Sequence, residues 1–313
     1  MAKFVKINRF SCAIVLLVTL ASNPAHAQKK LNVVTTLPDF AHIASAIGGE
    51  HVSTFAIVTG YQDPHFVDPK PSYILKLSRA DMFVTVGLDL EAGWVPSLLK
   101  SARNGKIQKG GGGYVDASVN VPLLNVPTNV SREQGDIHVY GNPHYWTDPT
   151  NGKIIAQNIF DSLVALRPDG RAVFEANLMR FNAQLDAKIA EWREKMKPHR
   201  GKKIVAYHDH WPYLEAFMGF EIVDFLEPKP GIPPTPSQLA KIIGIIEQQN
   251  IGAIIIAPYY RKDSAELVAR RTNASVITLA SSVGAFEGID TYFDVFDHDV
   301  ELLTKAFTMS KPQ

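Results

Sequence analysis

The sequence has too little of several features to belong to some common protein classes. Its 32 basic and 31 acidic residues leave a net charge of +1, which excludes the strongly basic surface of a nucleic-acid-binding protein. Beyond residue 27, no apolar run approaches the roughly 18 residues that a membrane-spanning helix needs. With 46% hydrophobic and 20% charged residues, the composition is that of a globular protein.

The first 27 residues have the features of a secretory signal peptide. Three basic residues within the first nine precede an apolar run at 13–21, and Ala25-His26-Ala27 is a small-residue cleavage site. The only cysteine, Cys12, lies early in the apolar run and not at its small-residue end, so we expect neither a disulfide nor a lipid anchor in the mature chain. The sequence predicts cleavage after Ala27 and a periplasmic protein with no direct membrane anchor.

Short apolar runs rich in β-branched residues predict strands in both halves of the chain, at 31–37, 55–59, 82–88, 203–207, 220–226, 252–257 and 275–279. Helical patterns lie between them, at 39–47, 71–79, 236–248 and 263–272. Strands that alternate with helices form parallel sheets covered on both faces. We therefore expect an α/β fold with two lobes, each a parallel β-sheet flanked by helices.

One long amphipathic helix is predicted between the halves. Its apolar residues recur at spacings of three and four: Phe174, Leu178, Phe181, Leu185, Ile189, Trp192 and Met196. About 27 residues would span about 40 Å. We interpret residues 28–167 as the N-terminal lobe, 168–200 as a rigid interlobe helix and 201–313 as the C-terminal lobe, although an ordinary surface helix of one domain would show the same pattern.

Three histidines occur in loops marked by proline or at the end of a strand. They are His65 in Asp63-Pro64-His65, His144 in Asn142-Pro143-His144-Tyr145-Trp146-Thr147-Asp148, and His208 in Tyr207-His208-Asp209. Any one of them alone would more often be a structural histidine, but three imidazoles from different loops suit a zinc ion. Asp148 or Asp209 could orient a ring from behind, although an aspartate before a proline or after a strand also favours a simple turn.

These ordered motifs, together with Pro71-Ser72, resemble the zinc- and manganese-binding proteins of ABC importers, the ZnuA/TroA-like group. The resemblance covers nearly the whole mature chain. It implies two β/α lobes joined by a rigid helix, one metal in the cleft, and His65, His144 and His208 as ligands. It also implies an ABC-type membrane permease with a separate cytoplasmic ATPase as partners, and we expect a monomer.

Two departures from the family pattern concern the metal. Family members often carry an acidic fourth ligand where this chain reads Ala280-Ser281-Ser282-Val283-Gly284. Water, Glu287 or Asp209 could take that position, and water is our choice. Zinc members often have a long histidine-rich loop, whereas here only His138 precedes the His144 motif. His138 could capture metal for the site or be a solvated loop residue. The same two interpretations apply to His210.

Zn²⁺ is the predicted cargo, because three imidazoles without a clear carboxylate suit zinc, whereas manganese prefers more oxygen ligands. The sequence thus predicts a non-enzymatic binding protein that carries Zn²⁺ to a permease, with Mn²⁺ as the alternative. An exported zinc hydrolase is a further alternative, disfavoured because no glutamate adjoins a ligand histidine and no His-Glu-x-x-His motif occurs. A carrier of haem, siderophore or corrinoid would need an apolar or arginine-lined cleft.

The proline-rich segment at 227–236 leads into a predicted helix. We interpret this segment as a stiff wall that contributes shape and no chemistry.

Overall fold

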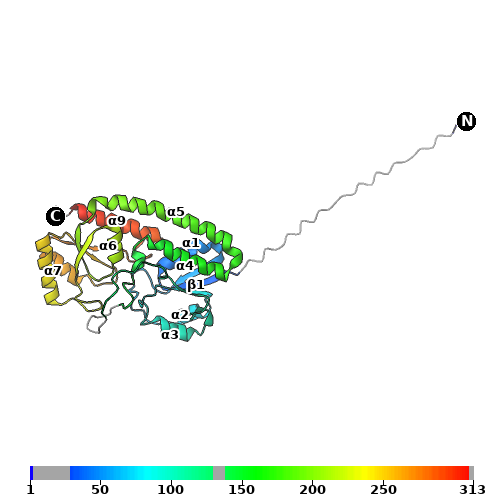
Figure 1. Ribbon diagram of the computed structural model, residues 1–313, viewed down its shortest axis with the longest axis horizontal. Helices are drawn as coiled ribbons and strands as arrows, with labels where there is room; N and C mark the ends of the chain where they lie inside the picture. The colour runs from blue at the N-terminus through cyan, green and yellow to red at the C-terminus, as the bar shows by residue number, and fades with distance from the viewer. Residues whose placement is uncertain (3–28, 130–137, 310–313) are drawn as a thin grey trace.

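The computed structural model describes residues 1–2, 29–129 and 138–309. Apart from its first two residues, the predicted signal peptide lies outside the described residues, and so do Cys12 and the cleavage site after Ala27. The described residues contain two four-stranded parallel sheets with helices packed around them (Figure 1). The predicted α/β fold of two lobes joined by a long helix is confirmed. The lobe boundaries at 28–167, 168–200 and 201–313 remain our proposal.

The first sheet has the strand order β2-β1-β3-β4. Its strands are β1 (Leu31–Thr35), β2 (Val52–Ala56), β3 (Met82–Thr85) and β4 (Tyr114–Asp116). The second strand begins three residues before the predicted start at 55, because Val52–Ala56 pairs with the whole of β1. The short strand β4 was not predicted, since three residues carry no readable alternation of apolar and polar positions.

The second sheet repeats this arrangement in the order β6-β5-β7-β8. Its strands are β5 (Lys203–Ala206), β6 (Glu221–Phe225), β7 (Ala253–Ile256) and β8 (Ser275–Thr278). All four residues of β7 are buried, as expected for a strand covered on both faces. The register pairs Ala206 with Phe225, so the chain segments that follow β5 and β6 leave the sheet side by side.

Nine α-helices connect and cover the sheets within the described residues: α1 (Pro38–Gly48), α2 (Pro71–Ser78), α3 (Val95–Ala102), α4 (Asn151–Leu166), α5 (Arg171–Met196), α6 (Pro212–Met218), α7 (Pro236–Gln249), α8 (Asp263–Arg271) and α9 (Tyr292–Met309). Four of them, α1, α2, α6 and α7, begin with proline, whose fixed φ suits the first helical turn. Helix α7 is followed by Asn250, whose left-handed conformation ends the helix.

Helix α5 is the long helix predicted from the sequence. It has 26 residues, and all seven apolar residues expected on its inner face are buried. It packs on α1 and α4 from the first half of the chain and on α6 and α9 from the second (Figure 1). One hydrophobic cluster extends from the first sheet through α5 to the second, so the two lobes share a continuous core.

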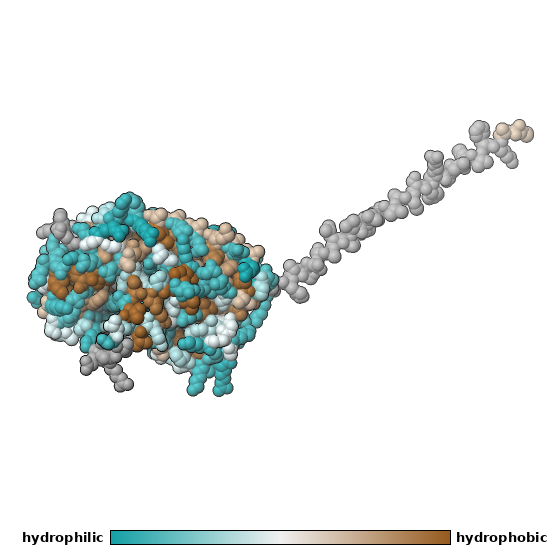
Figure 2. All heavy atoms as spheres, viewed as in Figure 1, coloured by the Kyte–Doolittle hydropathy of each residue, from teal (hydrophilic) through white to brown (hydrophobic). Residues whose placement is uncertain are grey.

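The surface mixes polar and apolar residues. On the face in Figure 2, hydrophilic residues are spread widely and apolar side chains lie in smaller groups between them. Among the helices that the structure describes, none is both long enough and apolar enough to cross a membrane.

Candidate metal site

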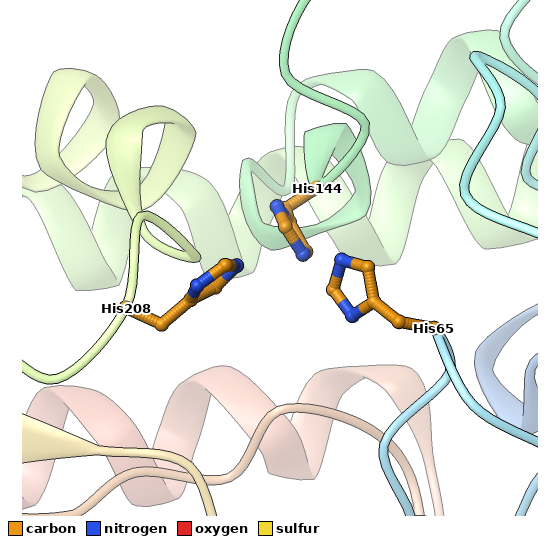
Figure 3. A group of neighbouring side chains, drawn as sticks. All are labelled: His65, His144 and His208. Atoms are coloured by element: carbon orange, nitrogen blue, oxygen red, sulfur yellow. The ribbon is translucent and has the colours of Figure 1, made fainter. Parts of the chain in front are cut away.

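Three histidines from separate loops meet between the two sheets. His65 follows β2, His144 lies between β4 and α4, and His208 comes two residues after the end of β5. One ring nitrogen from each lies within 4.8 Å of the others, and Figure 3 shows the three rings turned toward one another. His144 is fully buried and His208 is 6% exposed. The structure thus brings together the three histidines that the sequence predicted as ligands.

Each of these rings is held from behind through Nδ1. The Nδ1 atom of His65 donates to Asp63 Oδ1 (2.7 Å), and that of His208 to Glu227 Oε2 (2.7 Å). His144 Nδ1 lies 2.9 Å from Asn142 Oδ1. When Nδ1 carries the proton, Nε2 presents its lone pair, which is the form of histidine that binds a metal.

The Nε2 atoms of His65 and His144 are buried and have no hydrogen-bond partner within the described residues. Buried polar atoms nearly always have a hydrogen-bond partner or another ligand. Two neighbouring buried nitrogens without one therefore indicate that a bound group outside the chain is their partner. Three imidazole nitrogens at this spacing match the donor set that Zn²⁺ prefers. The residues present accordingly fit a bound divalent transition metal.

Burial and the neighbouring charges keep the ring of His144 neutral. Burial, followed by the charge of the neighbouring histidines, holds the pKa of His144 well below its ordinary value. For Asp63, burial alone would raise the pKa, but the hydrogen bond and charge of His65 together lower it. The site therefore offers a neutral His144 backed by an amide, beside His65 backed by an ionised carboxylate.

The residues behind the rings were missed at the sequence level, although a signal for two of them was present. Asp63-Pro64-His65 and Asn142-Pro143-His144 form the same turn, in which the first side chain accepts from both the backbone N–H and the ring of the histidine. An Asx residue two positions before each histidine is that signal.

The third supporting residue, Glu227, belongs to the proline-rich segment at 227–236. The prediction that this segment contributes only shape is wrong at its first residue, which bonds His208. Glu227 follows the end of β6 by two residues, as His208 follows the end of β5. Neighbouring parallel strands place such equivalent positions side by side at the carboxyl end of the sheet.

The other candidate residues have different surroundings. Asp148 accepts hydrogen bonds from the backbone and hydroxyl of Thr150, in the turn before α4 (both 2.7 Å). Asp209 accepts from the side-chain amide of Asn142, through its backbone oxygen (2.8 Å) and its carboxylate (3.2 Å), and so supports His144 indirectly. Glu287 is exposed. Trp146 Nε1 donates to the backbone oxygen of Ser281, which stands where family members often carry the acidic ligand.

Two further histidines border the cluster. The ring of His138 lies 5.3 Å from that of His65, between centroids, and the ring of His210 lies 4.2 Å from that of His144. Both have a buried Nε2 that finds no hydrogen-bond partner in the part of the chain that the structure describes. Burial and the nearby histidines lower the pKa of His138 to about 3, and they hold the pKa of His210 well below its ordinary value.

Comparison with known proteins identifies the family. A family model described as "Zinc-uptake complex component A periplasmic" (ZnuA) matches residues 33–306. The chain belongs to this family. The resemblance drawn from the histidine motifs is thereby confirmed, and the chain is a substrate-binding protein of the metal ABC-transporter class.

The relatives of the chain carry the names of two metals. A manganese ABC transporter substrate-binding lipoprotein, PsaA of Streptococcus anginosus, is 26% identical over 95% of this chain and 96% of its own. The zinc-binding lipoprotein AdcA of Streptococcus pneumoniae is also 26% identical, over 96% of this chain and 60% of its own. Both are named lipoproteins, whereas the absence of a lipid anchor in the present protein stays a prediction.

Solved structures share the fold. A crystal structure of ZnuA superimposes with a TM-score of 0.75 at 23% identity, over 89% of this chain and 99% of that one. The Mn-bound periplasmic metal binding protein from Candidatus Liberibacter asiaticus gives a TM-score of 0.73 at 22% identity, over 89% and 100%.

Proposed function

We propose that this protein captures Zn²⁺ between its two lobes and delivers it to an ABC-type membrane permease driven by a separate ATPase. The observation that carries the proposal is the convergence of His65, His144 and His208, with unpartnered Nε2 atoms on the first two. Membership of the zinc-uptake family supports the transport role. Cleavage after Ala27, a periplasmic location and a monomeric state belong to the same proposal.

Zinc is preferred over manganese because of the chemistry of the donors. All three converging side chains are imidazoles, and the carboxylates of Asp63 and Glu227 are hydrogen-bonded to the Nδ1 atoms of His65 and His208. Imidazole suits zinc, whereas manganese favours carboxylate and water oxygens. The same commitment of Asp63 and Glu227 argues against a zinc hydrolase, because neither carboxylate is free to act as a general base.

The test is a chelator-competition measurement of Zn²⁺ and Mn²⁺ affinity on residues 28–313. We expect one zinc per chain, bound more tightly than manganese. His65→Ala should weaken zinc by more than about 100-fold, since loss of even an outer partner of a metal ligand costs about 10–100-fold. His199→Ala is the matched control, because His199 lies before the start of β5, at the opposite end of that strand from His208. Tighter manganese binding, or zinc binding that ignores His65→Ala, would overturn the proposal.

A further inference from the structure

His138 adds a fourth imidazole at the edge of the three-histidine cluster. It lies between β4 and α4, six residues before His144, and its backbone oxygen accepts a hydrogen bond from Gly141 (3.2 Å). Its Nε2 atom is buried and has no hydrogen-bond partner among the described residues. A loop histidine in water would satisfy this atom with solvent, so its burial beside two other orphaned Nε2 atoms needs an explanation.

The spacing of the rings fits a tetrahedral ion. With Zn–N bonds of about 2.0–2.1 Å at tetrahedral angles, the centroids of two bound imidazoles lie about 5 Å apart. The three pairs within the cluster measure 5.2, 5.5 and 5.6 Å. The pair His65–His138 measures 5.3 Å, within the same range, and His138–His144 measures 6.3 Å. To stand at tetrahedral spacing from all three rings, the ring of His138 would have to move about 1 Å toward His144 and also toward His208.

The cavities place His138 on the open side of the cluster. A cavity of about 610 Å³ is lined by His65 and His138 together with Asp68, Asp89 and Trp94. A second cavity of about 60 Å³ is lined by His138, His144 and His208. His138 therefore stands between the three-histidine cluster and the larger cavity, where a fourth ligand would close the site.

The other candidates for a fourth ligand are already committed or badly placed. The ring of His210 is 4.2 Å from that of His144, closer than tetrahedral ligands stand. Asp209 is bonded to Asn142. Glu287 is exposed and Ser281 offers no carboxylate.

We propose that Nε2 of His138 is the fourth metal ligand, so that the site holds its ion with four imidazoles and no carboxylate. This inference rests on the proposed function, and it identifies His138 as the residue that makes the site select Zn²⁺ over Mn²⁺. Four nitrogen donors in a closed tetrahedron match Zn²⁺ and oppose Mn²⁺, which favours oxygen ligands and higher coordination numbers. It replaces the water that the sequence alone suggested for this position.

X-ray absorption at the zinc edge tests the proposal, because the scattering from imidazole rings gives the number of histidine ligands. We expect four imidazoles in the native protein and three plus an oxygen in His138→Ala, with zinc affinity lowered at least about tenfold. Tyr140→Ala is the control, since Tyr140 is an exposed residue of the same loop and should leave both readouts unchanged. His138→Asp, which keeps a ligand but makes it an oxygen donor, should shift preference toward Mn²⁺.

Three imidazoles in both the native protein and His138→Ala, with equal zinc affinity, would overturn the fourth-ligand proposal and leave the three-histidine site intact. A native protein that binds no zinc would overturn the proposed function itself.

Discussion

His208 and Glu227 occupy equivalent positions on neighbouring parallel strands, and their side chains meet at 2.7 Å between Nδ1 and Oε2. Each lies two residues beyond the carboxyl end of its strand, and both side chains are buried, at 7% and 8% exposure. The sheet register itself therefore sets the orientation of one candidate ligand. The position of His208 in the candidate metal site therefore depends on the pairing of β5 and β6 as well as on the loops that follow them.

Glu227→Ala should weaken zinc binding by about 10–100-fold, the usual cost of losing the partner that orients a metal-binding histidine. Glu227→Gln should cost less, because it keeps an acceptor for Nδ1 and loses only the charge. Chelator competition measures both. Glu287→Ala is the control, as an exposed glutamate; an effect of Glu287→Ala as large as that of Glu227→Ala would mean that the wrong carboxylate has been assigned to the site.

The two Asx-Pro-His turns allow a similar test at the other two histidines. Asn142→Ala removes the acceptor for both the backbone N–H and the ring of His144, together with the donor to Asp209. We expect a loss of zinc affinity of about 10–100-fold. Asp63→Asn keeps the equivalent acceptor for His65 and should lose less. Equal zinc affinity in Asn142→Ala and the native protein would show that the turn plays no part in orienting His144.

Metal binding should weaken as pH falls, because a proton and a metal compete for the same ring nitrogen. The lowered pKa of His144, caused mainly by burial, means that this ring is already neutral at pH 6 and has no proton to release. Calorimetry in buffers of different ionisation enthalpy measures the number of protons released when one zinc binds. This number should be smaller than the number of imidazole ligands. Release of one proton per ligand at pH 6 would contradict the neutral state of His144.

Glu91 should make folding stability depend on pH in the opposite direction from a carboxylate whose pKa is lowered in the folded state. Burial raises its pKa to about 7, although the backbone N–H groups of Val86 and Gly87 donate to it. Between the ordinary value of 4.5 and about 7, the folded state holds a proton that the unfolded state has released, so stability falls as pH rises.

Urea unfolding of the metal-free protein at pH 5 and pH 8 measures this effect. The free energy of unfolding of Glu91→Gln, relative to the native protein, should be higher at pH 8 than at pH 5. Glu50→Gln, at an exposed glutamate, should show no such change. A constant difference between Glu91→Gln and the native protein at both pH values would rule out the raised pKa.

Gly60 marks a close approach between the two halves of the chain. A Cβ atom there would lie 2.2 Å from the backbone oxygen of Val283 and 2.3 Å from the nitrogen of Ala285. Gly60→Ala must push these segments apart, which should cost about 1–3 kcal/mol of stability. Gly93→Ala is the control, since no atom lies within 4 Å of its Cβ position. Equal denaturation midpoints for the two variants would show that the contact is not tight.

The sequence predicted what depends on repeated patterns. The buried face of α5 could be predicted because seven apolar residues follow the helical repeat, and the three histidines because each adjoins a proline or a strand end. The partners behind the rings were missed for two different reasons. Glu227 reaches His208 only through the register of β5 and β6, which leaves no local signal in the chain. Asp63 and Asn142 stand two positions before their histidines, and this local signal was present in the sequence but overlooked.

The most direct test of the central claim is a crystal structure of the zinc-loaded protein with anomalous scattering measured at the zinc edge. The account predicts a single peak, about 2.0–2.1 Å from Nε2 of His65, His144 and His208. A peak at any other group of residues, or zinc held by fewer than these three rings, would contradict it.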